Sequence, residues 1–389
     1  MSLIFLAVDF PPARGGIQKV AFELPRALHL AGEEVGVLSV CAPGSEEFDR
    51  QCPYPVARVP AGDKAQVATN LSAGVVELFE QFTTPPQAII ATKWFPEGLS
   101  AISARRLLRC PAVVIGHGRE FRLTGLNPLK WLMQKYIMLQ VDMALAVSEW
   151  TAGQLRRCGV RRDRVHVIHN GIRPKPFETP IDTSALREEL RISDEPVLLT
   201  VGRLVLRKGQ ADVIRLLGPI MQQVGPVTYV IAGAGPQEQL LRDTADSCGV
   251  QEHVRFAGEV DDALLPAYYQ LCDVFVMPTR DVPGDPLEGF GLVYLEANAA
   301  GKPVVGTDCG GVADAIEDDV SGLLVPRDDD GALVHAVSRL LLDGTLAQRL
   351  GQEGQQRVRD RFTWDRVARR FMDAIGELPQ PATAAGTAH

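Results

Sequence analysis

Two glutamates that stand eight positions apart, Glu288 and Glu296, are the most chemically suggestive pair in the chain. Glu288 precedes a glycine-rich segment that is typical of a helix start, and Glu296 then falls about two turns into that helix. Backbone N–H groups at a helix start can face phosphate oxygens, here those of Phe290, Gly291 and Leu292. We therefore predict that Glu288 reaches toward a sugar and Glu296 toward the vicinal hydroxyls of a ribose. The pair alone is more typical of a solvent-exposed helix face, so the prediction depends on its neighbours.

Two cations follow a predicted strand, VLLTV (197–201), and supply those neighbours. Arg203 comes directly after Gly202, and Lys208 stands before Gly209 and the next predicted helix. A diphosphate leaving group gains negative charge as a glycosidic bond breaks, and fixed cations can neutralise it where another enzyme uses Mg²⁺. We therefore expect no metal and no other cofactor. The alternative for the two cations is an ordinary solvated loop.

The first half of the chain carries two glycine-flanked strand ends. The strand LIFLAV (3–8) leads to Gly15-Gly16, which lets backbone approach a phosphate closely, although a plain turn is the alternative. The G-x-G-x-x-G spacing of a dinucleotide site is missing, which argues against a dehydrogenase. The strand AVVIG (112–116) leads to His117, which we predict to hydrogen-bond the transferred sugar; a structural role is its alternative.

Two aspartate-rich segments are predicted to cap helices rather than to bind metal. Asp261-Asp262 follow the predicted strand VRFAG, and Asp328 to Asp330 precede the helical run ALVHAVSRLL. Carboxylates at such positions accept hydrogen bonds from free N–H groups and complement the helix dipole.

Short aliphatic runs alternate with amphipathic stretches along both halves, which predicts an α/β fold with two doubly wound parallel sheets. About six strands are expected in each half, and ligands should bind at the carboxyl ends of the strands. The prolines of IRPKPFETPIDT (172–183) mark the boundary. The predicted parts are an acceptor-binding domain (1–175), a nucleotide-sugar-binding domain (184–362), a helix that packs back on the first domain (363–377) and a disordered tail (378–389).

Charge is divided unevenly over the chain. Residues 1–178 hold 21 Lys and Arg against 16 Asp and Glu, whereas residues 179–389 hold 19 against 32. The basic half suits either a solvated surface or an anionic acceptor or membrane, and no nucleic-acid-binding motif accompanies it. The stretch PLKWLMQKYIML (128–139) is expected to pack mainly in the core, with contact to a membrane as the alternative.

Seven scattered cysteines and the lack of a signal peptide or an apolar membrane span favour a cytoplasmic location. Association with the inner face of the membrane would agree with the basic first half.

Together and in this order, these motifs resemble those of the family 4 glycosyltransferases with the GT-B fold. The resemblance spans nearly the whole chain and includes Gly15-Gly16, HGRE (117–120) and LEANAAGKPVVGTDCGG (295–311). It implies two Rossmann-like domains that face each other across a cleft, and metal-independent transfer with retention by a front-face mechanism.

The same resemblance implies a role for each matching residue. Arg203 and Lys208 would bind the diphosphate, Glu288 the sugar hydroxyls, and Glu296 the ribose. Gly16 would approach the β-phosphate and His117 the sugar being transferred. The remaining candidates are the backbone near Val260 for the base, and Asp9, Arg119 and Glu120 for the acceptor.

The segments WF (94–95), GHGRE and RDVPGDPLEGFGLVYLEANAAG (280–301) look most similar to phosphatidylinositol mannoside mannosyltransferases. This branch implies a GDP-mannose donor and a lipid-linked, anionic acceptor. A family 4 enzyme that transfers from a UDP-sugar to a soluble or polysaccharide acceptor is the alternative. From other classes, a nucleotide-sugar epimerase and a non-catalytic nucleotide-sugar sensor stay open.

Overall fold

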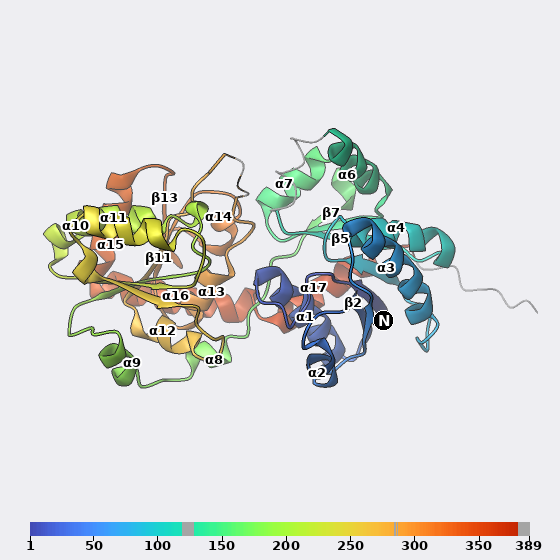
Figure 1. Cartoon of the computed structure of the whole chain (residues 1–389), viewed down its shortest axis with the longest axis horizontal. Coiled ribbons are helices and arrows are strands. Elements are labelled where there is room, and N and C mark those ends of the chain that lie inside the picture. The colour runs from blue at the N-terminus through green and yellow to red at the C-terminus, as the bar shows by residue number, and fades with distance from the viewer. Residues whose placement is uncertain (119–127, 284, 286, 380–389) are drawn as a thin grey trace, which may run out of the picture. The chain divides into compact units, whose positions relative to one another are not determined.

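The computed structural model describes residues 1–118, 128–283, 285 and 287–379, and it divides into two compact units. Unit 1 comprises Met1–Gly171 and the chain from Trp364 onward, and unit 2 comprises Ile172–Thr363. The prediction of two parallel α/β sheets is confirmed in both units, in which helices cover both faces of the sheet (Figure 1).

Unit 1 contains a seven-stranded parallel sheet with the order β3-β2-β1-β4-β5-β6-β7. Its strands are β1 (Ser2–Leu6), β2 (Glu34–Val40), β3 (Val56–Val59), β4 (Ala88–Ala91), β5 (Ala112–Gly116), β6 (Met143–Ala146) and β7 (Val165–Val167). Its helices are α1 (Gly16–Leu30), α2 (Ser45–Arg50), α3 (Lys64–Phe79), α4 (Glu97–Leu108), α6 (Pro128–Gln140), α7 (Glu149–Arg157), the 3₁₀ turn η2 (Arg162–Arg164) and α17 (Trp364–Gly376). The order places β1, β4 and β5 side by side, so their carboxyl ends share one edge.

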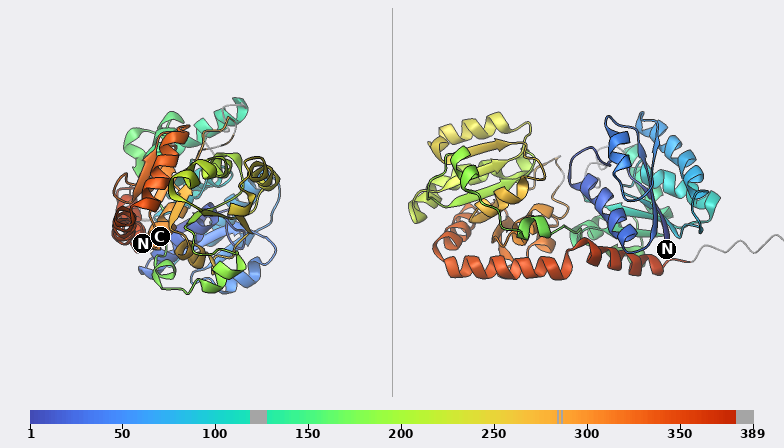
Figure 2. Two further views of the ribbon diagram at one scale, coloured as in Figure 1. Left: turned by 90° about the vertical axis from the view of Figure 1, so that its left-hand side faces the viewer. Right: turned by 90° about the horizontal axis from the view of Figure 1, so that it is seen from below.

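Alternate residues of β1 face opposite sides of this sheet, as strand geometry requires. Ile4 belongs to the cluster that α3 and α4 cover, whereas the ring of Phe5 stacks on Phe371 of α17 with 5.9 Å between ring centroids. Helix α17 also packs on α1, and both further views show it as the red helix of unit 1 (Figure 2). The last part of the chain therefore completes the core of unit 1, and Leu378 beyond α17 is still buried.

Unit 2 contains a six-stranded parallel sheet with the order β10-β9-β8-β11-β12-β13. Its strands are β8 (Val197–Val201), β9 (Thr228–Ala232), β10 (Val254–Gly258), β11 (Val274–Met277), β12 (Val304–Thr307) and β13 (Gly322–Val325). Its helices and 3₁₀ turns are α8 (Lys175–Glu178), α9 (Ser184–Glu189), η3 (Leu206–Lys208), α10 (Gln210–Val224), α11 (Glu238–Ser247), η4 (Gln251–His253), α12 (Leu265–Leu271), α13 (Leu292–Ala299), α14 (Val312–Ala315), α15 (Asp330–Leu342) and α16 (Gly344–Arg361). Because β8 and β11 pair in the middle of the sheet, the loops that follow them emerge together.

Two details differ from the sequence-based expectations. The edge strand β3 was not predicted, because VARV is short and has an arginine in place of an aliphatic residue. Helix α6 was expected to lie mainly in the core, but only Gln134, Ile137 and Met138 are buried, and most of its large apolar side chains are exposed. The core expectation is therefore wrong for one face of this helix.

Candidate functional site

The loop that follows β8 carries the predicted cations. Lys208 ends the 3₁₀ turn η3, and its side chain runs back past Gly202, whose Cα faces the lysine Cε and Nζ. Gly209 has a φ of 71°, and a Cβ at this position would clash with the carbonyl oxygen of Pro278 after β11. This loop is therefore held directly against the segment that leads to Glu288.

Glu288 lies at the centre of a compact ion-pair network. Its Oε2 atom is 2.6 Å from Nζ of Lys208 and 3.0 Å from a guanidinium nitrogen of Arg207. Arg207 also lies 3.6 Å from a carboxylate oxygen of Asp285. Burial alone would raise the pKa of Glu288, but the charges and hydrogen bonds of Lys208 and Arg207 lower it to about 2. Glu288 is therefore a carboxylate at neutral pH, bound to two cations.

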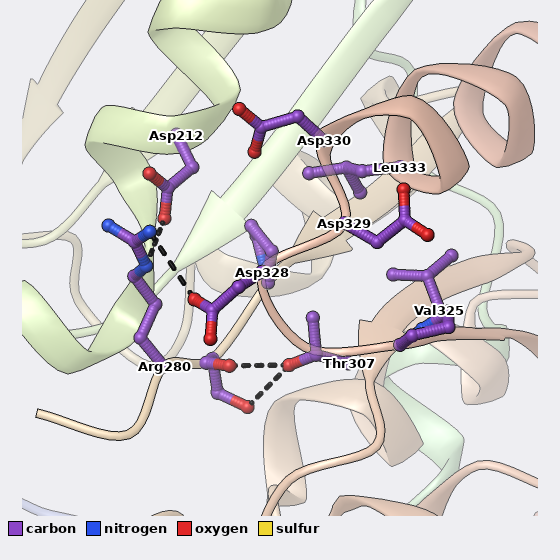
Figure 3. A pocket seen from close by; sticks show the side chains of 11 residues that line it. Asp212, Arg280, Thr307, Val325, Asp328, Asp329, Asp330 and Leu333 are labelled. Carbon is purple, nitrogen blue, oxygen red and sulfur yellow. Dashed lines mark hydrogen bonds and ion pairs between the residues drawn. The ribbon is translucent and has the colours of Figure 1, made fainter.

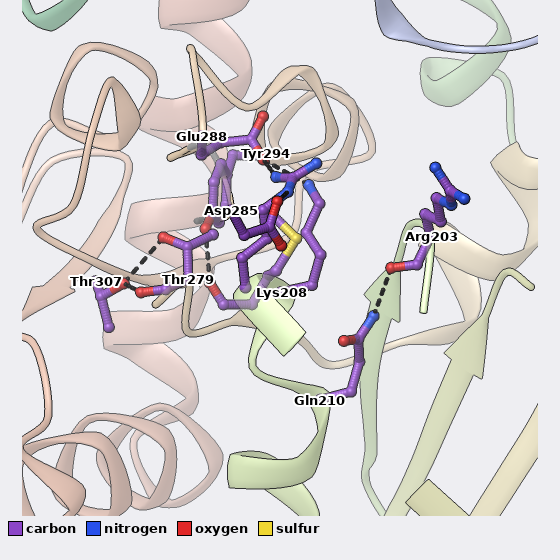
Figure 4. Close-up of polar contacts among 10 residues, drawn as sticks. Arg203, Lys208, Gln210, Thr279, Asp285, Glu288, Tyr294 and Thr307 are labelled. Carbon is purple, nitrogen blue, oxygen red and sulfur yellow. Dashed lines mark hydrogen bonds and ion pairs between the residues drawn. The ribbon is translucent and has the colours of Figure 1, made fainter. Parts of the chain in front are cut away.

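The two predicted cations do not lie together on Glu288. Lys208 is only 8% exposed, whereas Arg203 is exposed and lies to one side of the network, where its carbonyl oxygen accepts a hydrogen bond from Gln210 (Figure 4). Arg207, which sequence reasoning missed, takes the place beside Lys208. The signal for it was present in the sequence, because Arg207 and Lys208 are consecutive cations just before a helix.

Glycines fix the backbone of Glu288. Its carbonyl oxygen accepts a hydrogen bond of 2.9 Å from the N–H of Gly311, and a Cβ at Gly310 would clash with this same oxygen. The glycines that follow β12 therefore fix the backbone position of Glu288, which explains why the segment GTDCGG belongs to the same site.

Helix α13 begins at Leu292, later than expected, after Gly291 with a φ of 100°. Glu296 consequently lies about one turn into the helix rather than two, and this part of the prediction is wrong. Its side chain is 4% exposed, and its Oε2 atom accepts a hydrogen bond of 2.8 Å from the hydroxyl of Tyr269 in α12. Burial and the charge of Glu296 raise the pKa of Tyr269 well above its ordinary value. The phenol of Tyr269 therefore stays protonated at neutral pH and can donate this hydrogen bond.

The other donor-site candidates lie around these elements. Phe290 is buried, with its ring against Phe362, and Gly291 and Leu292 form the start of α13. Val260 follows the edge strand β10 and is half-buried.

In unit 1 the ends of three neighbouring strands bring polar residues together. Asp9 follows β1 and forms an ion pair with Lys93, which follows β4. His117 follows β5, is 7% exposed and has a hydrogen bond with the backbone of Thr92. Burial and the charge of Lys93 lower the pKa of His117 to about 4, so its imidazole is neutral at physiological pH. Lys93 was not predicted, although it follows a strand as His117 does.

Gly16 is the first residue of α1, and no described atom would lie within 4 Å of a Cβ at this position. Packing within unit 1 therefore does not require a glycine here. Two further acceptor candidates, Arg119 and Glu120, lie outside the described residues.

A separate pocket lies at the carboxyl ends of β11 to β13, beside the aspartate segment of α15. Its lining includes Arg280, which lies 3.1 Å from Asp212 and 3.5 Å from Asp328 (Figure 3). Asp329 accepts a hydrogen bond from the N–H of Ala332, so the helix-cap prediction is confirmed there. The corresponding prediction for Asp261-Asp262 is wrong, because α12 begins only at Leu265 and Asp261 contributes its backbone carbonyl instead.

Within the described ranges, no three or more His, Cys, Asp or Glu side chains are grouped so that they could hold a metal ion. None of the helices described is both long and apolar enough to cross a bilayer.

Both halves of the chain match models of known families. Residues 14–175 match the model described as "Glycosyltransferase Family 4", and residues 182–357 match "Glycosyl transferases group 1". The boundary between the two matches falls close to the start of unit 2.

Similarity to individual proteins extends over nearly the whole chain. This chain is 31% identical to a GDP-mannose-dependent alpha-(1-6)-phosphatidylinositol monomannoside mannosyltransferase of Mycobacterium tuberculosis. The alignment has 388 residues and covers 96% of this chain and 98% of the relative. The corresponding enzyme of Mycolicibacterium smegmatis is also 31% identical, with 93% of this chain and 95% of the relative covered. Anabaena HepE in complex with UDP and glucose shares the fold with a TM-score of 0.79 at 21% identity, over 97% of this chain and 100% of that structure. The chain therefore belongs to the family 4 (group 1) glycosyltransferases with the GT-B fold.

Proposed function

We propose that this glycosyltransferase moves mannose from GDP-mannose to a hydroxyl of a lipid-linked or other anionic acceptor, with retention and without a metal ion. The observation that carries the donor site is the convergence of Lys208 and Arg207 on Glu288 beside the start of α13. The choice of GDP-mannose rests on the names of the mycobacterial relatives.

The network suits a donor that brings its own negative charge. Lys208 is nearly buried and is balanced by a carboxylate, so a diphosphate can share this lysine with Glu288 at little additional desolvation cost. We assign Lys208 and Arg203 to the diphosphate, with Arg207 as a further cation. The N–H groups of Phe290, Gly291 and Leu292 complete the phosphate surroundings.

Glu288 would then accept hydrogen bonds from the sugar hydroxyls, and Glu296 from the ribose. Both carboxylates are positioned before the donor arrives, by the cations in one case and by Tyr269 in the other. Val260 would contribute backbone contacts to the base. On unit 1, Gly16 is assigned to the β-phosphate, His117 to the transferred sugar, and Asp9 to the acceptor.

The proposed transfer proceeds on one face of the sugar. The bond between the anomeric carbon and the β-phosphate oxygen breaks, and the acceptor oxygen bonds to the same carbon from the same side. The acceptor proton passes to the departing phosphate oxygen, so the products are the mannoside and GDP. Lys208 and Arg203 would stabilise the charge that develops on the diphosphate. His117 is neutral, which suits hydrogen bonding to the sugar rather than proton transfer.

The acceptor proposal has a different basis. The relatives are named for phosphatidylinositol monomannoside, and the first half of this chain is basic. An acceptor with an anionic headgroup would place the enzyme at the inner face of a membrane as a peripheral protein.

Thermal unfolding with GDP, UDP and ADP in the presence of EDTA tests the donor proposal, since a ligand at about 100 times its Kd adds roughly 2.7 kcal/mol. We expect GDP to raise the melting temperature more than UDP or ADP. Preference for UDP or ADP would reject GDP-mannose but keep the glycosyltransferase. Stabilisation only after metal is added would contradict the metal-free site.

A further inference from the structure

The segment that connects β1 to α1 has a buried part and an exposed part. Phe10 is 2% exposed, whereas the stretch from Ala13 to Gly16 is exposed. Pro11 and Pro12 lie between the two parts. A proline has no N–H group, so at these two positions the backbone can be held only through its carbonyl groups.

Arg58 supplies such a contact. It lies in the edge strand β3, and its side chain is 10% exposed. Its Nη2 atom donates a hydrogen bond of 2.9 Å to the carbonyl oxygen of Pro11. The guanidinium group also lies over the ring of Phe10, 5.3 Å from the ring centre. One side chain therefore contacts two consecutive residues of the segment.

The other hydrogen bonds of Arg58 fix its own position. Nε and Nη2 bind the two carboxylate oxygens of Asp49 in α2, at 2.9 and 2.7 Å. Nη1 donates to the hydroxyl of Ser39 at 3.2 Å and to the carbonyl oxygen of Val40 at 2.9 Å. Each of the five N–H groups of the guanidinium thus has an acceptor. A buried polar network in which every group is satisfied is rigid, so Arg58 is a firm attachment point for Pro11.

Aromatic packing connects this attachment point with α1. The ring of Phe10 packs on Phe22 of α1 and on Phe48 of α2, with ring centroids 6.3 and 6.0 Å apart. Phe48 is followed directly by Asp49, the carboxylate partner of Arg58. The start of α1 is therefore placed relative to the sheet by contacts in which Arg58 takes part.

We propose that Arg58 is a positioning residue for sugar transfer, which acts through the β1–α1 segment without touching either substrate. This inference rests on the proposed function, in which Asp9 and Gly16 of the segment contact the acceptor and the β-phosphate. Because Pro11 and Pro12 restrict the backbone between these two residues, a shift at Pro11 would be passed on to Gly16. A lysine at position 58 would keep the charge but could not bind a carboxylate through two nitrogens and two carbonyl groups at once.

Hydrogen exchange followed by mass spectrometry tests the attachment without any substrate. Arg58→Lys should speed up exchange in peptides that cover residues 8–20 by about fivefold or more. The matched control is Arg105→Lys, because Arg105 of α4 also binds a carboxylate, that of Asp142, and a carbonyl oxygen, that of Gln140. Asp142 precedes β6, so this contact lies at the amino ends of the strands, and exchange over 8–20 should be unchanged.

A transfer assay with GDP-mannose and an anionic mannosylated lipid gives the functional readout. Arg58→Lys should lower kcat by about tenfold or more, since a displacement of about 1 Å at a reacting group can cost about a hundredfold. The donor KM should change far less, because most of the residues assigned to the donor lie in unit 2. Arg105→Lys should keep the wild-type kcat.

Two further variants separate positioning from a general loss of stability. Arg58→Lys combined with Gly16→Ala should lose little more than the larger of the two single losses, because both changes act on the same segment. Asp49→Asn leaves one acceptor for the guanidinium and should show a smaller loss of kcat with the same small effect on KM. Circular dichroism and thermal unfolding establish that each variant is folded.

The inference would be overturned by a folded Arg58→Lys variant with wild-type kcat, by unchanged exchange over residues 8–20, or by an equal loss of kcat in Arg105→Lys. Losses that multiply in the double variant would also reject an effect through this segment. Failure of the proposed function has a different signature. Faster exchange in Arg58→Lys, with a wild-type protein that releases no GDP from GDP-mannose, would reject the proposed substrates and keep Arg58 as the attachment point of the segment.

Discussion

The network around Glu288 leads to a quantitative prediction for Glu288→Gln, which keeps the shape of the side chain and removes its charge. The pKa of Glu288 is about 2 in the folded protein, against an ordinary value of 4.5. One pKa unit corresponds to about 1.4 kcal/mol, so the ionised carboxylate stabilises the fold by about 3 kcal/mol. We expect the variant to fold but to lose free energy of unfolding of this order at neutral pH.

The pH dependence of this difference has a definite sign. Because the pKa of Glu288 is lowered on folding, its contribution is fully present above about pH 4.5 and is lost as the pH falls toward about 2. Urea unfolding of wild type and variant, from neutral pH to about pH 3, should show a gap that narrows on acidification. Equal stabilities at neutral pH, or a gap independent of pH, would refute the reasoning.

Nucleotide binding separates the role of Glu288 from that of Lys208. Glu288→Gln frees both cations from their carboxylate, so GDP should bind as tightly as to wild type or more tightly, while transfer falls steeply. Lys208→Met removes the proposed charge-assisted contact to the diphosphate and should weaken GDP binding by about tenfold or more. Calorimetry in EDTA measures both affinities. A similar loss of GDP affinity in the two variants would contradict the assigned roles.

Three further variants test the remaining residues. His117→Asn should lower turnover. Because the pKa of His117 is lowered to about 4, the pH profile of the wild-type rate should show no ionisation of this group near neutral pH. An ionisation near pH 6.5 in the wild-type profile that disappears in the variant would disprove the assignment of a neutral imidazole. Tyr269→Phe removes the hydroxyl that positions Glu296 and should raise the donor KM by roughly tenfold with little change in kcat; the reverse pattern in steady-state kinetics would exclude a positioning role. In Gly16→Ala the added methyl group would contact no described side chain, so the melting temperature should be unchanged while the transfer rate falls. An unchanged transfer rate would reject the proposed phosphate contact of Gly16. Gly209→Ala, whose methyl group would clash with Pro278, serves as the destabilised comparison.

The sequence predicted both sheets well because their buried strands are nearly uninterrupted aliphatic runs. VLLTV and AVVIG coincide with β8 and β5, and both are fully buried. The strand β3 was not predicted because it is an edge strand, which tolerates a polar residue. Its Arg58 forms an ion pair with Asp49. For α6, the composition predicts a largely apolar helix but does not tell which of its two apolar faces the unit covers.

The candidate site was predictable in its residue types and less so in its contacts. Glu288 and Lys208 are 80 positions apart, and only the pairing of β8 with β11 brings their loops together. Arg207 and Arg203 are both cations of one loop, and the 3₁₀ turn η3 decides that Arg207 faces Glu288. The partner of Glu296 was also not predictable, because Tyr269 comes from another helix.

The most direct test of the proposed function is to follow the anomeric configuration of the product by NMR. The purified protein is given GDP-mannose, an anionic mannosylated lipid acceptor and excess EDTA. We predict that GDP is released and that the α-configuration of the donor is kept in the new mannoside. A β-mannoside, or transfer that begins only when a divalent metal is supplied, would contradict the front-face, metal-free mechanism.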